Sequence, residues 1–136
     1  MRVFLDTNVV IDYATQRQPF CQAANAIFQL SQDGTIDASA SALTFVTLAY
    51  ILRKQISKDE IYRCLRGITS IVAVTQTGNR EIQQAIAAEW KDFEDAVQFS
   101  SAKFSAIDVI LTRNQKDFQS VEIPIMSPED FLDKLI

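Results

Sequence analysis

Small polar and acidic residues follow the first apolar run of this chain. Residues 3–5 are Val-Phe-Leu, and Asp6, Thr7 and Asn8 come directly after them. A buried parallel strand has this pattern, and ligands of open α/β sheets bind just beyond the carboxyl ends of the strands. We therefore expect Asp6 at the functional edge of a sheet. Thr7 or Asn8 is the expected cap of the next helix; in the purely structural alternative, Asp6 and Asn8 only cap and turn the chain.

Further acids stand where such a sheet would bring them toward Asp6. Asp92, Glu94 and Asp95 lie at the start of a predicted helix, and Asp117 follows the third predicted strand. Oxygen-only clusters of this kind suit Mg²⁺ or Mn²⁺, ions that activate water and stabilise charge on a phosphodiester. The structural alternatives are a helix-capping pair for Asp92 and Asp95, and a solvated loop position for Asp117.

The groups available for catalysis are restricted by two further observations. Asp108 precedes its predicted strand, which places it at the opposite edge of the sheet and outside the site. The chain contains no histidine, which excludes Ser-His-Asp and Cys-His triads, imidazole bases and the usual zinc sites. If the protein is a hydrolase, carboxylates or a carboxylate-bound metal must carry the chemistry.

The charge of the chain gives no global field that would attract nucleic acid. Seventeen acidic residues outnumber thirteen Lys and Arg residues, for a net charge of −4. A local basic patch remains open in the stretch 53–66, although a solvated pair of helices explains it at least as well. Its cationic residues are Arg53, Lys54, Lys58, Arg63 and Arg66.

Length and composition predict one globular domain over residues 1–136. No apolar run approaches the length of a membrane span, and the first strand is too short for a signal peptide, so a cytoplasmic protein is the default expectation. Cys21 and Cys64 are far apart without a CxxC motif, which favours reduced, packed thiols over a disulfide.

Strand and helix patterns alternate along the chain. Core strands are predicted at 2–5, 71–74 and 108–111, a brief extended piece at 35–39, and a short edge strand at 123–125 because Pro124 cannot donate to a ladder. Helices are predicted at 9–14, 20–30, 41–54, 57–67, 79–89, 93–104 and from 128 onward. This alternation predicts an α/β fold, a three-layer α/β/α sandwich around a central parallel sheet.

Four segments in this order resemble the PIN domain family, and the resemblance runs nearly end to end. It implies a compact α/β/α fold and, as in many members, an Mg²⁺- or Mn²⁺-dependent ribonuclease. Stand-alone bacterial members of this size are often VapC-type toxins, dimeric and paired with an antitoxin protein. The segments are Val-Phe-Leu-Asp-Thr-Asn-Val-Val-Ile-Asp-Tyr at 3–13, Ser-Ala-Leu-Thr-Phe-Val-Thr-Leu-Ala-Tyr at 41–50, Asp-Phe-Glu-Asp-Ala-Val at 92–97 and Leu-Thr-Arg-Asn-Gln-Lys-Asp-Phe at 111–118.

The resemblance assigns roles to individual positions. The family's first acid falls on Asp6 and its third on Asp95, while its second, usually Glu, falls on Thr47 and its fourth on Asn114. Asn114 keeps a carbonyl ligand without charge, and Asp117, three residues later, is a candidate substitute. The expected metal ligands are thus Asp6, Asp95, Asn114 and Asp117, with Asp6, Asp95 and Asp117 catalytic. The expected supporting residues are Thr7, Asn8, Thr47, Thr112 and Arg113.

Two functional hypotheses follow. The first is a metal-dependent endoribonuclease, the toxin of a toxin–antitoxin pair. The second is a PIN-fold module with weakened catalysis that binds RNA or a protein partner, which Thr47 and Asn114 favour. A receiver-like signalling domain is weaker, because the chain lacks paired acids at the first strand's end and an acceptor on a later strand. Helices within 41–67 are more apolar than one sheet face needs, which predicts a homodimer.

Overall fold

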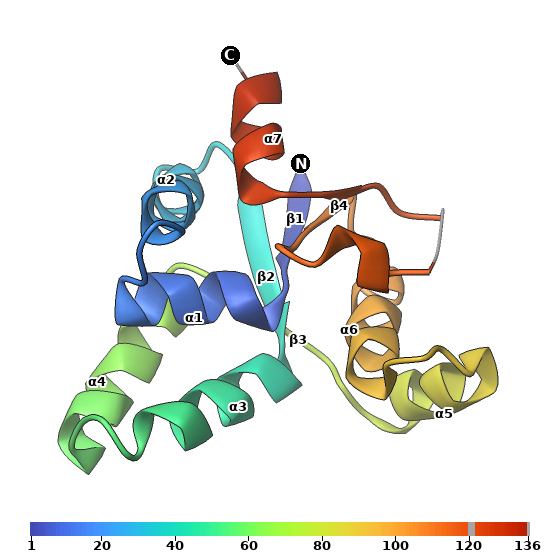
Figure 1. Cartoon of the computed structure of the whole chain (residues 1–136), viewed down its shortest axis with the longest axis horizontal. Helices are drawn as coiled ribbons and strands as arrows, with labels where there is room; N and C mark the ends of the chain where they lie inside the picture. The colour runs from blue at the N-terminus through green and yellow to red at the C-terminus, as the bar shows by residue number, and fades with distance from the viewer. Residues whose placement is uncertain (120–121, 136) are drawn as a thin grey trace.

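A central sheet of five parallel strands organises the computed structural model, which describes residues 1–119 and 122–135. The strands are β1 (Arg2–Leu5), β2 (Asp37–Ser41), β3 (Ala73–Thr75), β4 (Val109–Leu111) and β5 (Ile125–Met126). Their order across the sheet is β3-β2-β1-β4-β5, and every neighbouring pair is parallel. The predicted parallel sheet is therefore confirmed (Figure 1).

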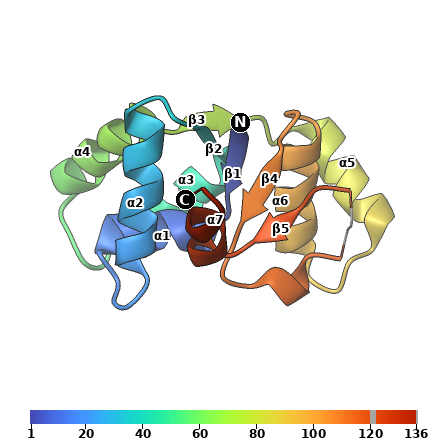
Figure 2. The ribbon, with the colours of Figure 1, turned by 90° about the horizontal axis from the view of Figure 1, so that it is seen from above.

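Helices cover both faces of the sheet, which confirms the three-layer α/β/α sandwich (Figures 1 and 2). One face carries α1, α2, α3, α4 and α7, and the other carries α5 and α6. No helix in the described ranges is long and apolar enough to cross a membrane. The bounds are α1 (Thr7–Thr15), α2 (Cys21–Gln32), α3 (Ala42–Leu52), α4 (Lys58–Thr69), α5 (Asn79–Ala88), α6 (Phe93–Lys103) and α7 (Pro128–Lys134), with a 3-10 turn η1 (Gln115–Asp117).

Side chains of the inner strands alternate between the two helical layers. Val3 and Leu5 pack in the core beneath α1 to α4, whereas Phe4 and Ile110 pack against α6, and none of the four is exposed to solvent. Burying a side chain of this size stabilises the fold by roughly 1.5–3 kcal/mol. The first strand is thus held from both sides, which fixes the position of the residue that follows it.

The order of the strands reverses at β1. The chain moves outward on one side through β2 and β3, then crosses by α5 and α6 to β4 and β5 on the other side. In such sheets a crevice opens at the carboxyl ends of the two strands where the order reverses, here β1 and β4. Asp6 and Thr112, which follow these two strands, therefore lie at the switch point.

Three strand predictions need correction. The extended piece expected at 35–39 is instead β2, an inner strand at Asp37–Ser41. The core strand expected at 71–74 is instead β3, an edge strand at Ala73–Thr75 with Val74 half exposed. The edge strand expected at 123–125 is instead β5 at Ile125–Met126. It begins two residues later than expected and pairs with β4.

Most helix starts agree with the capping signals of the sequence. Ser57 and Glu60 form the capping box of α4, although that helix continues through Gly67 to Thr69. Ser127 caps α7 with Pro128 at its first position.

Both cysteines are free, as expected, and burial raises the pKa of the Cys64 thiol.

Candidate functional site

Asp6 is the buried centre of a polar network at the switch point. Only 3% of the residue is exposed, so its carboxylate relies on protein donors rather than water. Its Oδ1 accepts hydrogen bonds from the Thr7 backbone N–H (2.8 Å) and from Gln98 Nε2 (3.1 Å). Its Oδ2 accepts from the Thr112 hydroxyl (2.7 Å) and, at 3.4 Å, from Asn8 Nδ2. These donors hold both oxygens in fixed positions and offset the cost of burying the charge.

Asp6 itself is the N-cap of α1, because its side chain accepts the Thr7 N–H. The expectation that Thr7 or Asn8 caps this helix is therefore wrong. Thr7 and Asn8 instead supply a hydroxyl that contacts Thr44 Oγ1 at 2.8 Å and an amide that contacts Thr112 Oγ1 at 3.3 Å. Asp6 can both cap the helix and take part in the site. Its Oδ1 accepts the Thr7 N–H at the start of α1, and its Oδ2 accepts from Thr112, the residue after β4.

Gln98 joins the elements around Asp6, and sequence reasoning missed it. It lies on α6 with no exposed surface, and its two Nε2 hydrogens are shared among Asp6 Oδ1, Thr7 Oγ1 and Thr44 Oγ1, which lie 3.0–3.1 Å from the nitrogen. Its Oε1 accepts from the Ser41 hydroxyl at the end of β2. The only sequence signal was a long amide within a stretch of small and apolar residues.

Asp95 is the second buried acid of the site. It lies in the first turn of α6, where the Asp92 carboxylate caps the helix by accepting the Asp95 N–H at 3.1 Å. Burial raises the pKa of Asp95 from 3.8 to about 7, and repulsion from Asp6, Asp92, Asp117 and Glu94 acts in the same direction. These carboxylates are therefore close enough to interact, and the cluster would be stabilised by a cation.

The raised pKa of Asp95 makes stability depend on pH. Between pH about 4 and 7 the unfolded chain releases the Asp95 proton while the folded protein keeps it, so stability falls as pH rises through this window. Asp95→Asn removes this cost, and we expect it to be more stable than wild type at pH 8 by roughly 1–2 kcal/mol, a value discounted for solvent screening. Urea unfolding at pH 4 and pH 8 measures it. A difference between the proteins that is the same at both pH values would contradict the expectation.

The remaining predicted ligands are less closely tied to Asp6. Asn114 is exposed and donates its backbone N–H to Thr112 Oγ1 at 3.0 Å. Asp117 is exposed on η1, and its charge contributes to the raised pKa of Asp95. Thr47 is half buried on α3, and its side chain makes no hydrogen bond among the residues described, whereas Thr44, one turn earlier, is in the network.

The donor chemistry of the site fits a hard divalent cation. Within residues 1–119 and 122–135, no three acidic or cysteine side chains gather closely enough to form a complete metal cage. Mg²⁺ does not require one, because it keeps several waters and is commonly held by one or two carboxylates together with substrate phosphates. Asp6 and Asp95 are two carboxylates that repel each other, and they are the residues that would hold such an ion.

Arg113 directly follows Thr112 and forms an ion pair with Asp12. Its Nε donates to Asp12 Oδ2 at 2.7 Å and its Nη2 to Asp12 Oδ1 at 3.2 Å. Its guanidinium lies 4.0 Å from the centre of the Phe20 ring. Asp12, only 2% exposed, was also missed from the sequence, where it reads as one more polar residue of a short helix.

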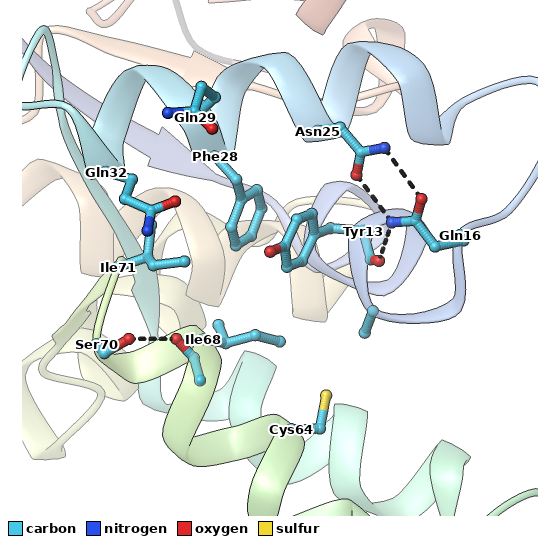
Figure 3. Close-up of a pocket in the computed structure, with 12 residues that line it drawn as sticks. Tyr13, Gln16, Asn25, Phe28, Gln29, Gln32, Cys64, Ile68, Ser70 and Ile71 are labelled. Carbon is cyan, nitrogen blue, oxygen red and sulfur yellow. Dashed lines mark hydrogen bonds between the residues drawn. The ribbon is translucent and has the colours of Figure 1, made fainter.

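One cavity lies apart from these acids. It has a volume of about 630 Å³ and is lined by residues of α1, α2, α4 and the segments that follow α1 and α4 (Figure 3). Tyr13 and Phe28 stack at 3.7 Å within it, and the Gln16 and Asn25 amides are hydrogen-bonded to each other at its edge. Its lining is rich in amides and contains no charged side chain.

Comparisons with known proteins agree with this architecture. Among solved structures, the chain is similar to a toxin–antitoxin complex from Klebsiella pneumoniae, with 21% identity, 93% of this chain and 97% of that chain covered, and a TM-score of 0.69. It is also similar to VapBC-1 from nontypeable Haemophilus influenzae, with 20% identity, 95% of this chain and 99% of that chain covered, and a TM-score of 0.71. DNA-bound VapBC from Salmonella typhimurium has 20% identity, 94% of this chain and 98% of that chain covered, and a TM-score of 0.71.

Sequence comparisons decide the family. No match was found among curated proteins. A family model described as a PIN domain matches residues 2–116, which include β1 to β4 and every residue of the Asp6 network. The chain therefore belongs to the PIN domain family.

Proposed function

We propose that this protein is a metal-dependent endoribonuclease that cleaves RNA phosphodiester bonds. The observation that carries this proposal is the pair of buried acids at the switch point: Asp6 is fixed by donors on both oxygens, and Asp95 has a pKa near 7 beside it. Such an arrangement attracts a divalent cation. Membership of a family in which nucleases are common supports the same conclusion.

In this proposal Asp6 and Asp95 hold Mg²⁺ or Mn²⁺, with the Asn114 carbonyl and Asp117 as further oxygen donors. The bound ion would activate water and stabilise charge on the phosphodiester. The chain's own contribution is positioning. Thr7, Gln98 and Thr112 hold the two oxygens of Asp6, and the repulsion around Asp95 is relieved when a cation arrives.

A cleavage assay tests the proposal. We expect pure protein to cleave RNA with Mn²⁺ or Mg²⁺ and to be silenced by EDTA, because no histidine can replace the metal. EDTA-resistant cleavage would refute the metal mechanism. A mixture of structured and unstructured RNAs is the appropriate substrate, since a nuclease of this kind can require one sequence or structure.

A second candidate function is a PIN-fold module that binds RNA or protein without cutting. Thr47, which lacks charge and lies outside the network, and the neutral Asn114 favour it. This alternative expects no metal-dependent cleavage in wild type, and RNA affinity that changes little in Asp95→Asn. The two hypotheses therefore give opposite results in the same pair of assays.

We also propose that the protein is the toxin of a toxin–antitoxin pair. The similar solved structure from Klebsiella pneumoniae is described as a toxin–antitoxin complex. An antitoxin for this chain would be a small protein encoded by the neighbouring gene. Co-expression of the two should give a complex that purifies intact and relieves any growth arrest caused by this chain alone.

The proposed homodimer places α3 and α4 at the interface. Val46 and Tyr50 on α3 are 68% and 65% exposed, and Tyr62 on α4 is 51% exposed. Exposed apolar groups gathered on one surface are typical of interfaces. We expect a dimer by light scattering at micromolar concentration, and a monomer for Val46→Glu with Tyr50→Glu. Ile86→Glu on α5, which is equally apolar and 52% exposed, is the control. A wild-type monomer would contradict the proposal.

A further inference from the structure

A separate hollow adjoins the acidic site. It has a volume of about 380 Å³ and lies between the segment before α6 and the segment around η1. Its lining consists of Lys91, Asp92, Lys116, Asp117 and Gln119. The Lys91 backbone N–H donates to Gln119 Oε1 at 3.1 Å, which joins the two walls.

The hollow shares two residues with the acidic cluster, because Asp92 and Asp117 line it. Asp92 caps the helix whose first turn holds Asp95, and Asp117 contributes to the repulsion that Asp95 feels. A ligand in the hollow would therefore lie next to acids that interact with Asp95.

Both lysine ammonium groups are available to an incoming anion. Lys91 and Lys116 are exposed. The ion pairs of the described residues join Arg80 to Glu81, Lys103 to Glu122 and Arg113 to Asp12, so neither Lys91 nor Lys116 is paired within that part of the chain. Arg113, the other cation near Asp6, is already engaged with Asp12 and Phe20.

An RNA strand bound at the acidic site would need cationic side chains nearby to offset repulsion between its phosphates and the carboxylates. A strand that brings one phosphate to Asp6 and Asp95 carries its neighbouring phosphates into a field made by five carboxylates. One divalent ion does not compensate that field along the strand. A lysine ammonium is a compact, mobile charge that binds phosphate well, and the hollow presents two of them at the edge of the acidic cluster.

We propose that Lys91 and Lys116 form a phosphate subsite for the RNA strand, holding the backbone phosphate next to the one presented to Asp6 and Asp95. This inference rests on the proposed function, because it takes RNA as the substrate. It also assigns RNA contact to this hollow rather than to the basic stretch 53–66.

The salt dependence of RNA binding tests the subsite. A fluorescently labelled single-stranded RNA of random sequence is titrated with protein in EDTA, which prevents metal-dependent cleavage, over a series of salt concentrations. For single strands, the slope of log K against log salt changes by about 0.7 for each phosphate that the protein no longer neutralises. We expect Lys91→Gln with Lys116→Gln to reduce the slope by about 0.7 if both lysines hold one phosphate, and by up to about 1.4 if each holds its own.

A matched pair of substitutions controls for the change in net charge. Lys54→Gln with Lys58→Gln removes the same charge from exposed positions in the basic stretch, and we expect it to leave the slope unchanged. Lys91→Arg with Lys116→Arg should keep the wild-type slope. Thermal unfolding of each variant checks that the fold is intact.

The outcomes separate failure of the subsite from failure of the proposed function. Wild-type binding with a slope that Lys91→Gln and Lys116→Gln do not change would overturn the subsite alone, as would an equal effect of the control pair. Absence of RNA binding by wild type at every salt concentration in EDTA, together with absence of both binding and cleavage in Mn²⁺, would overturn both the subsite and RNA as the substrate.

Discussion

Asp6→Asn and Asp95→Asn are each expected to lower metal-dependent RNA cleavage by roughly 100-fold or more. Each substitution keeps the size of the side chain and removes one negative charge that would hold the cation. Loss of a ligand charge removes several kcal/mol of charge stabilisation, and about 1.4 kcal/mol corresponds to a tenfold change in rate. Initial rates with Mn²⁺ on one RNA substrate measure the effect.

Asp108→Asn is the matched control for these substitutions. Asp108 precedes β4 and lies at the opposite edge of the sheet, as the sequence predicted. There its Oδ2 accepts the N–H of Arg2, the first residue of β1, at 2.8 Å. Its removal should leave cleavage unchanged. If Asp108→Asn lowers the rate as much as Asp6→Asn does, the effect comes from net charge or stability rather than from metal binding.

Arg113→Ala should destabilise the fold by about 3 kcal/mol. The substitution leaves the Asp12 carboxylate buried without its cation, and breaking a buried pair by removing one partner typically costs about 3–5 kcal/mol. We take the lower end because a quarter of the Arg113 side chain is exposed. Urea unfolding followed by circular dichroism gives the loss of free energy.

Two further variants identify the cause of that loss. Arg113→Lys keeps the charge but not the fork that contacts both oxygens of Asp12, so an intermediate loss is expected. Adding Asp12→Asn to Arg113→Ala removes the unpaired charge and should recover part of the stability. A double variant no more stable than Arg113→Ala would mean that the two side chains are not coupled.

The sequence predicts those parts of the fold that have a strong hydrophobic pattern. The strands at 2–5 and 108–111 are predicted because each contains a continuous apolar run, at residues 3–5 and 109–111. The inner strand β2 has the sequence Asp-Ala-Ser-Ala-Ser, without any large apolar side chain. Its alanines pack in the core on one face and its serines lie on the other, so its burial comes from its neighbours rather than from its own composition. The pattern therefore indicates a brief extended piece at 35–39 but not an inner strand of the sheet.

The sequence predicts the position of side chains that directly follow a strand. Asp6 and Thr112 lie at the carboxyl ends of β1 and β4, as expected, because the end of a buried strand is visible in the sequence. Gln98 and Thr44 come from helices, where the rotation of the helix decides which residue faces the site. On α3 this rotation brings Thr44 to Thr7 and Gln98, one turn before Thr47. Their role could be seen only once the helices were packed on the sheet.

A crystal structure of the protein soaked in Mn²⁺, with the metal located by anomalous scattering, tests the central claim most directly. The account predicts one strong Mn²⁺ peak at the carboxyl ends of β1 and β4, with Asp6 and Asp95 oxygens within roughly 2.0–2.6 Å of it, the range for hard divalent ions. The same soak of Asp6→Asn should lose the peak. A Mn²⁺ ion bound elsewhere, or a peak that persists unchanged in Asp6→Asn, would contradict the account.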